Sequence, residues 1–290
     1  MGYSGKHHKK SRIALNAENS SFKIFLCIAL STLLMSLFTA CNKNSGNMII
    51  VAGSTSVQPY AEVLAEEYAH SHPDQEVDIQ GGGSSAGIAA AESGTAEIGM
   101  SSRRLKENEK NLWSVEIAKD GLAIIVNPGN PVSNLSLEQI QLIYSGEIRK
   151  WNYLGGPDNN IHVIAREEGS GTRSAFEELV MGNAIITPRA IVQDSNGTVK
   201  QLVADDLNAV GFISLGLLDN SVKALRVDGV EATDENISNE KYSLFRSFLF
   251  ITQGPPEGLS KQFIDFVLSD AGQRILMDEG LISISGGYKQ

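Results

Sequence analysis

Four short loops of the chain are rich in Ser, Thr and Gly, the residue types that can surround a small anion with hydrogen-bond donors. The loops are residues 53–56 (GSTS), 81–87 (GGGSSAG), 101–103 (SSR) and 166–173 (REEGSGTR). Each follows a β-like run, and three of them open a segment with helical periodicity. Free N–H groups at a helix start attract an anion, glycine permits close approach, and Arg offers a planar fork that matches phosphate or sulfate oxygens. Together the loops predict a binding site for a tetrahedral oxyanion.

The apolar patterning supplies elements that can bring these loops to one place. Short β-like runs alternate with segments of helical periodicity, which is typical of an α/β fold with mainly parallel sheets. The expected strands are residues 48–52, 77–80, 97–100, 122–126, 161–165, 210–214 and 242–252, and the expected helices are residues 57–71, 86–93, 136–144, 173–181, 199–204, 260–268 and 271–278. Because ligands of such folds bind beyond the carboxyl ends of the strands, we expect the loops to converge there.

The first 40 residues have the pattern of an export signal. Residues 1–23 carry five Lys or Arg against one Glu, and residues 24–38 are apolar and uncharged. This apolar segment is too short to span a bilayer comfortably, so the pattern predicts a lipoprotein signal peptide over residues 1–40. Cys41 comes next, and the run FTAC that it ends resembles a bacterial lipobox. We therefore expect a lipid on Cys41 and a polar tether over residues 41–47.

The mature chain is expected to be strongly acidic. Removal of residues 1–40 takes away five positive charges and one negative charge, so the formal net charge changes from -10 to -14. Such a charge disfavours nucleic acids and anionic membrane surfaces as partners, although local donors can still hold a small anion in a buried site. One Cys remains, so no internal disulfide is expected. Neither a metal site nor a cofactor is expected, since no His/Cys cluster is present.

Two glycine patterns formally match enzyme motifs. Residues 81–86 fit the dinucleotide fingerprint GxGxxA, but no acidic residue ends a second strand about twenty residues further on. Residues 83–87 fit the GxSxG nucleophile elbow, but the only later His is His162, inside an expected strand. A phosphatase would also cradle phosphate, yet the four loops hold no metal-binding carboxylate cluster. We therefore expect no catalytic residue and keep a phosphatase acting on phosphate monoesters as the enzymatic alternative.

Several of these runs, taken together, resemble a known family. AGSTS, GGGSSAG, IGMSSR and REEGSGTR, followed by NAVGFISLG, have the order and spacing of the phosphate-binding subunits of bacterial ABC transporters. The resemblance covers essentially the whole mature chain. It implies a two-lobed periplasmic-binding-protein fold of type II, in which each lobe is a mainly parallel sheet flanked by helices and two strands form the hinge. Lobe 1 is then expected over residues 48–125 plus 240–290, and lobe 2 over residues 126–239.

The resemblance also implies roles for individual loop residues. Thr55 and Ser56 match donors of the first loop, Arg166 matches the Arg that contacts phosphate, and Glu168 matches the acidic residue that orients this Arg. Ser84 and the run 170–172 match further donors at helix starts. The full candidate set for phosphate binding is Ser54, Thr55, Ser56, Ser84, Ser102, Arg103, Arg166, Glu168, Ser170, Gly171 and Thr172.

One position departs from the best-known pattern of the family. Some members have an Asp that accepts the proton of bound phosphate, where this chain has Ser102 followed by Arg103. Ser can accept a hydrogen bond but discriminates less well against sulfate, which has no proton. The resemblance implies extracytoplasmic capture of phosphate and delivery to an ABC permease, with sulfate, molybdate or tungstate as alternative ligands. We expect an exported, monomeric, membrane-anchored lipoprotein that faces the periplasm or the cell exterior.

Overall fold

A mixed nine-stranded sheet organises the part of the chain that the computed structural model describes, residues 47–284. The signal peptide, Cys41 and most of the tether expected from the sequence lie outside these residues. The strand order is β2-β1-β3-β11-β4-β8-β6-β7, with β9 paired to β4 beside this path. The strands are β1 (Met48–Gly53), β2 (Glu76–Gly81), β3 (Ile98–Ser101), β4 (Trp113–Val126), β6 (His162–Arg166), β7 (Ile191–Gln193), β8 (Ala209–Ser214), β9 (Lys223–Ala224) and β11 (Phe245–Thr252). A separate pair joins β5 (Asn134–Leu135) to β10 (Arg226–Val227).

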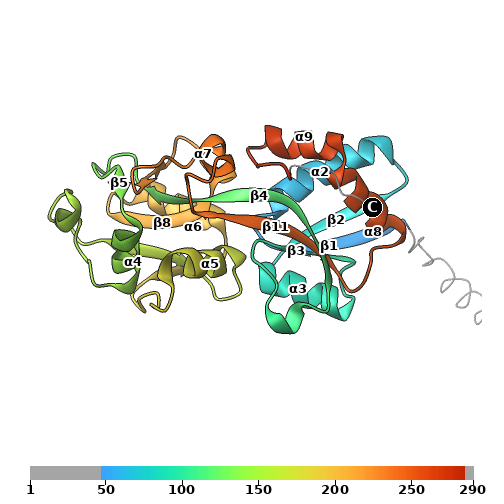
Figure 1. The fold of residues 1–290 in the computed structure, drawn as a ribbon, viewed down its shortest axis with the longest axis horizontal. Coiled ribbons are helices and arrows are strands. Elements are labelled where there is room, and N and C mark those ends of the chain that lie inside the picture. Colours follow the sequence, from blue (N-terminus) through green and yellow to red (C-terminus); the bar gives the residue numbers. More distant parts are fainter. Residues whose placement is uncertain (1–46, 285–290) are drawn as a thin grey trace, which may run out of the picture. The chain divides into compact units, whose positions relative to one another are not determined.

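Strand β4 joins two mainly parallel half-sheets. Residues 113–121 of β4 pair antiparallel with β11, and residues 122–126 pair antiparallel with β8. On one side, β1 runs parallel to β2 and β3, and on the other side β6 runs parallel to β7 and β8. Figure 1 shows β4 and β11 running between these two halves. We call the part with β1, β2 and β3 the first half and the part with β6, β7 and β8 the second half.

Helices cover both halves (Figure 1). The first half carries α2 (Gln58–Ser71), α3 (Ser84–Ser93), α8 (Gly258–Leu268) and α9 (Asp270–Asp278). The second half carries α4 (Leu137–Ser145), α5 (Gly171–Phe176), α6 (Asn196–Asp205) and α7 (Asp234–Ser238), and α5 continues as a π-helix over Glu177–Met181. Short 3-10 helices lie at Glu107–Glu109, Trp151–Leu154 and Leu215–Leu217.

Each half packs around an apolar core of its own. In the first half, residues such as Leu64 of α2 and Phe250 of β11 are fully buried in one cluster. In the second half, the rings of Phe176 and Phe212 stack with their centroids 4.2 Å apart in another cluster. Burial of one such side chain stabilises the fold by about 1.5–3 kcal/mol. The separate main clusters of the two halves confirm the expected two-lobed α/β architecture.

The expected elements are present with shifted ends, and the structure adds elements that were not expected, among them β7 and α7. The helix expected from residue 199 begins at Asn196, because the Ser195 side chain caps it by accepting a hydrogen bond from the Thr198 N–H. The strand expected over residues 122–126 is the second part of β4, whose first part carries charged residues and was not predicted. Sheet pairing changes partner between Gly121 and Leu122. The boundaries given above for the two lobes stay a prediction.

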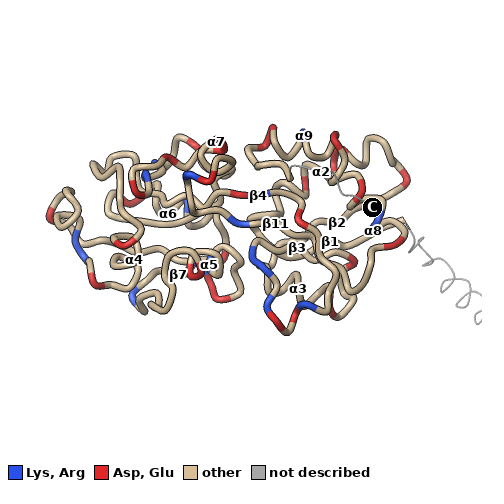
Figure 2. Tube along the Cα trace, in the orientation of Figure 1, with Lys and Arg blue, Asp and Glu red and all other residues tan. Residues whose placement is uncertain are grey.

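Charged residues of both signs occur on the helices and loops of both halves (Figure 2). Within residues 47–284, no helix is both long and apolar enough to cross a membrane.

Candidate functional site

Three serine hydroxyls of the first half form a buried cluster at the carboxyl ends of β1 and β3. Ser54 Oγ donates to Ser102 Oγ at 2.9 Å, and the Ser102 N–H donates to Ser84 Oγ at 3.0 Å. Ser84 opens α3, and Gly83 before it has a φ of 88°, which favours glycine. All three serines are at most 2 % exposed. The structure therefore brings together three of the loops that the sequence singled out.

The fourth loop meets this cluster from the second half. Thr172, in the first turn of α5, lies with its Oγ1 2.7 Å from Ser56 Oγ. Gly171 packs so closely that a Cβ there would overlap with the hydroxyls of Ser84 and Ser102. Only glycine fits at this position without displacing these side chains. Hydroxyls and helix starts of both halves thus surround one small region.

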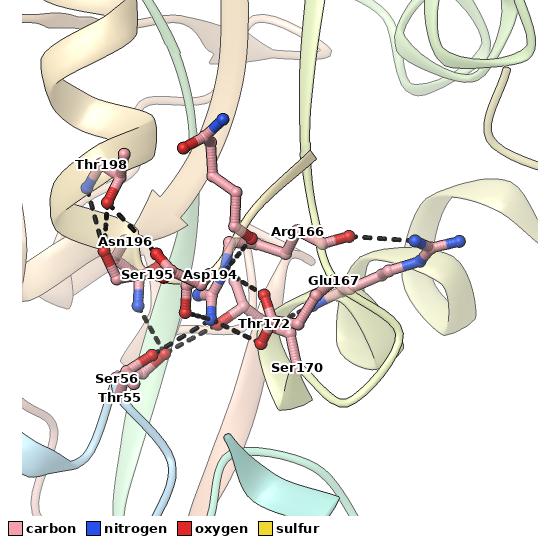
Figure 3. A network of polar contacts seen from close by, with 12 residues as sticks. Thr55, Ser56, Arg166, Glu167, Ser170, Thr172, Asp194, Ser195, Asn196 and Thr198 are labelled. Atoms are coloured by element: carbon pink, nitrogen blue, oxygen red, sulfur yellow. Dashed lines mark hydrogen bonds and ion pairs between the residues drawn. The ribbon is translucent and has the colours of Figure 1, made fainter. Parts of the chain in front are cut away.

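Arg166 ends β6 and points its buried guanidinium into the same region (Figure 3). Nη2 donates to Thr55 Oγ1 at 3.1 Å, across the two halves, and to the Asp194 carbonyl at 2.9 Å. Nε donates to Glu167 Oε2 at 2.9 Å, and Nη2 donates to Oε1 of the same carboxylate at 3.0 Å. Nη1 is buried and has no hydrogen-bond partner among the described residues. A buried donor of this kind calls for an acceptor.

The acidic partner of Arg166 in the structure is Glu167, whereas Glu168 was expected in this role from the sequence. The Ser170 N–H donates to the Glu167 carbonyl at 3.1 Å, which closes a turn with Glu168 at its corner. The Glu168 side chain is exposed as a result. Ser170 itself caps α5, because its hydroxyl accepts from the Arg173 N–H at 3.2 Å.

Arg103 is buried, and both of its Nη atoms have partners among neighbouring side chains, whereas Nε has none among the described residues. Nη1 and Nη2 donate to the two carboxylate oxygens of Glu109 at 2.7 and 2.9 Å, and Nη2 reaches Ser85 Oγ at 3.4 Å. The hydrogen bonds from Arg103 lower the pKa of Glu109. The structure thus places Arg103 beside the start of α3, where it contacts Ser85 of the second loop.

Three further residues join the site although the sequence reasoning missed them. Asn196 Nδ2 donates to Ser56 Oγ at 2.8 Å, and Arg246 Nη2 donates to the same oxygen at 3.2 Å. Asp120 Oδ2 accepts from Arg246 at 2.9 Å. Asn196 follows β7 and opens α6, so the criterion used for the other loops would have found it had the helix start been placed correctly. Arg246 and Asp120 gave no signal, because they lie within strands.

The charges of the site are paired. Each of three buried arginines has its own carboxylate, namely Glu167 for Arg166, Glu109 for Arg103 and Asp120 for Arg246. Burial raises the pKa of Asp120, and the Arg246 guanidinium acts in the opposite direction. A bound anion would therefore meet fixed hydrogen-bond donors more than net positive charge.

No arrangement for catalysis is visible within residues 47–284. His162 pairs with Asp206 at 2.6 Å on the exposed surface, and its hydrogen bonds do not reach Ser85 of the formal nucleophile elbow. No group of His, Cys, Asp and Glu within the described range has the geometry of a metal site. What the site offers is a set of hydroxyl, amide and guanidinium donors at helix starts, which suits the binding of a small oxyanion.

Comparison with known proteins agrees with this class of site. The family model described as the PBP superfamily domain matches residues 39–271. The phosphate-binding protein PstS of Bacillus subtilis is 33% identical over 249 residues, which is 84% of this chain and 82% of that protein. PstS of Borreliella burgdorferi is 31% identical over 275 residues, covering 90% of this chain and 98% of that protein.

Two solved structures that are similar to this chain are also phosphate-binding proteins. A phosphate ABC transporter substrate-binding protein of Clostridium perfringens, determined with bound phosphate, is 46% identical with a TM-score of 0.80, over 82% of this chain and 100% of the other. An ABC-type phosphate transport receptor of Vibrio cholerae is 42% identical with a TM-score of 0.70, over 81% and 100% of the two chains. The fold is that of the two-lobed solute-binding proteins. Within that class, the chain belongs to the family of PstS phosphate-binding proteins.

Proposed function

We propose that this protein captures inorganic phosphate outside the cytoplasm and delivers it to an ABC permease for import. The observation that carries the proposal is the meeting of four loops from both halves of the protein. One of these loops holds Arg166, whose Nη1 is buried and lacks a partner among the described residues. Family membership supports the same reading, because relatives that share most of the chain are phosphate-binding proteins.

The residues proposed to hold phosphate lie on the loops described above. Arg166 offers a charged donor, and Thr172, Ser170 and Gly171 lie at the start of α5, where free N–H groups point outward. The first half is proposed to contribute Ser54, Thr55, Ser56, Ser84 and Ser102 to the site. Arg103 is proposed to support the start of α3, and Glu167 takes the orienting role instead of Glu168.

Binding is proposed to require closure of the two lobes and no covalent step. Donors of the first half, such as Ser56, and donors of the second half, such as Thr172, are brought within hydrogen-bond distance of one another. An anion held by both sets would favour the closed arrangement, because its contacts would be complete only there. Release would follow when the lobes separate at the permease.

Selectivity is proposed to rest on neutral hydroxyls. Ser102 Oγ accepts from Ser54 and lies 3.3 Å from Ser84 Oγ. A hydroxyl can accept a hydrogen bond from the P–O–H group of hydrogen phosphate, but it can also donate one to a sulfate oxygen. We therefore expect a preference for phosphate that is weaker than a buried carboxylate would give.

Attachment to the membrane is proposed to be through a lipid on Cys41, after removal of residues 1–40. The basic start, the short apolar segment and the FTAC run support this. The protein is proposed to act as a monomer tethered by residues 41–47, facing the periplasm or the cell exterior.

Calorimetry on the purified, phosphate-stripped protein tests the proposal. Phosphate should bind with one site per chain, sulfate and molybdate should bind more weakly, and a phosphate monoester should be neither bound tightly nor hydrolysed. Absence of phosphate binding would refute the proposal. Steady release of phosphate from the monoester would instead identify a phosphatase, and tighter binding of sulfate or molybdate would reassign the ligand.

A further inference from the structure

A buried ion pair connects the two crossing strands to the hydroxyls of the site. Asp120 on β4 and Arg246 on β11 are direct partners in the antiparallel register. Asp120 is 1 % exposed and Arg246 is 6 % exposed. Arg246 Nε lies 3.1 Å from Asp120 Oδ2, and Arg246 Nη2 lies 2.9 Å from the same oxygen. Ser214 Oγ on β8 donates to the other carboxylate oxygen at 2.7 Å. The pair is therefore anchored where the sheet passes from one half to the other.

The hydrogen bonds around Ser56 can be accounted for one by one. A serine hydroxyl has one donor and two acceptor lone pairs. Arg246 Nη2 at 3.2 Å and Asn196 Nδ2 at 2.8 Å are both donors, so Ser56 Oγ accepts from both. Its own proton is then donated to Thr172 Oγ1, 2.7 Å away. The Thr172 hydroxyl consequently keeps its hydrogen for a different acceptor.

We infer that Arg246 and Asp120 are positioning residues of the anion site, which act through Ser56 to fix the Thr172 hydroxyl as a donor to the ligand. The inference rests on the proposed function, because it assigns a role in phosphate binding. Arg246, on the crossing strand β11, donates a hydrogen bond to one lone pair of Ser56 Oγ. No residue of the second half takes part in this hydrogen bond. Asn196 and Thr172 belong to the second half and complete the arrangement when the halves meet.

Asp120 is needed because the guanidinium is buried. A buried charge without a partner is strongly destabilising, whereas a paired and hydrogen-bonded one can be retained. Asp120 neutralises Arg246 and, since both contacts are made to one carboxylate oxygen, also fixes the plane of the guanidinium. This leaves Nη2 aimed at Ser56, while Nη1 has no partner among the described residues.

The test is a thermodynamic cycle in phosphate affinity measured by calorimetry. The neutral double variant Asp120→Asn/Arg246→Gln removes the pair without leaving a buried charge, and Ser56→Ala removes the hydroxyl through which it acts. Loss of one hydrogen bond to a charged group corresponds to an affinity about 10- to 100-fold lower, and we expect each change to produce a loss of this order. The triple variant should bind no more weakly than Ser56→Ala, whereas a merely structural role would make the two losses multiply.

Controls separate this role from general destabilisation. Arg226→Gln breaks an ion pair with Glu231 in which both side chains are more than half exposed, and should leave the affinity unchanged. Circular dichroism without phosphate reports whether each variant folds. If the neutral double variant does not fold, Arg246→Lys keeps the charge balance but loses the fork geometry, and should show a similar loss that also disappears in the Ser56→Ala background.

The outcomes are distinct. Absence of phosphate binding by the unaltered protein would refute the proposed function itself. Unaltered binding in a folded Asp120→Asn/Arg246→Gln or Arg246→Lys protein would overturn the inference, as would losses that multiply in the triple variant. A loss confined to proteins that retain Ser56 is the result that the inference predicts.

Discussion

Replacement of Arg166 by Ala should remove most of the phosphate affinity. The guanidinium is 1 % exposed, and its Nη1 has no partner within the described residues, so it is available to an anion oxygen. A hydrogen bond to a charged group contributes about 1.5–3 kcal/mol, and Nη1 carries two N–H groups that can both donate to phosphate oxygens. The loss is then about 3–6 kcal/mol, or roughly 10²- to 10⁴-fold in Kd. Glu167 would also lose its partner and repel the anion, which pushes the loss toward the upper value.

Calorimetric titration of Arg166→Ala with phosphate measures this loss, with Arg104→Ala as the matched control. The Arg104 side chain is 83% exposed and its contact with Glu178 spans 3.9 Å, so its removal should change Kd by less than about threefold. A folded Arg166→Ala protein with a Kd within about threefold of the unaltered value would show that the site is misassigned.

Glu167→Gln should weaken phosphate binding by about tenfold through loss of the charged bond that holds Arg166, whereas Glu168→Gln should have no effect in the same titration, and the reverse order would contradict the assignment. Phosphate affinity should change by less than about threefold between roughly 0.05 and 0.5 M NaCl, since the buried arginines are already paired, and a steep fall would indicate reliance on exposed charge. Because Arg103 holds the folded-state pKa of Glu109 below its usual value of 4.5, this ion pair contributes stability above that pH and loses it as the pH falls through the lowered pKa. Glu109→Gln should accordingly lower the free energy of unfolding by about 1–3 kcal/mol at pH 7. If the difference in free energy of unfolding between the variant and the unaltered protein stayed constant as the pH was lowered, this prediction would be contradicted. A radioactive fatty acid should label the unaltered protein and not Cys41→Ser, and equal labelling would remove the proposed anchor.

The fold was readable from the sequence where its pattern is periodic. Continuous apolar runs such as residues 122–126 are buried on both faces and form strands as expected. The part of β4 before them was missed because Glu116 and Lys119 interrupt its apolar pattern. Pairing with β11 stabilises that segment, and a contact with a strand more than a hundred residues away leaves no local signal.

The sequence predicted those site residues that lie together in short loops at helix starts. Gly, Ser and Thr at helix starts indicated the first, second and fourth loops, and the structure brings their hydroxyls together. Sequence order alone did not separate Glu167 from Glu168, since the choice depends on which residue lies at the corner of a turn. Asp120 and Arg246 were missed for a different reason, because their role comes from strand register.

Equilibrium dialysis of the phosphate-stripped protein against radiolabelled phosphate tests the central claim most directly. The account predicts saturation at one phosphate per chain, displacement by unlabelled phosphate, and weaker displacement by an equal concentration of sulfate. Failure of the protein to retain label above a protein-free control, or displacement by sulfate that equals displacement by phosphate, would contradict it.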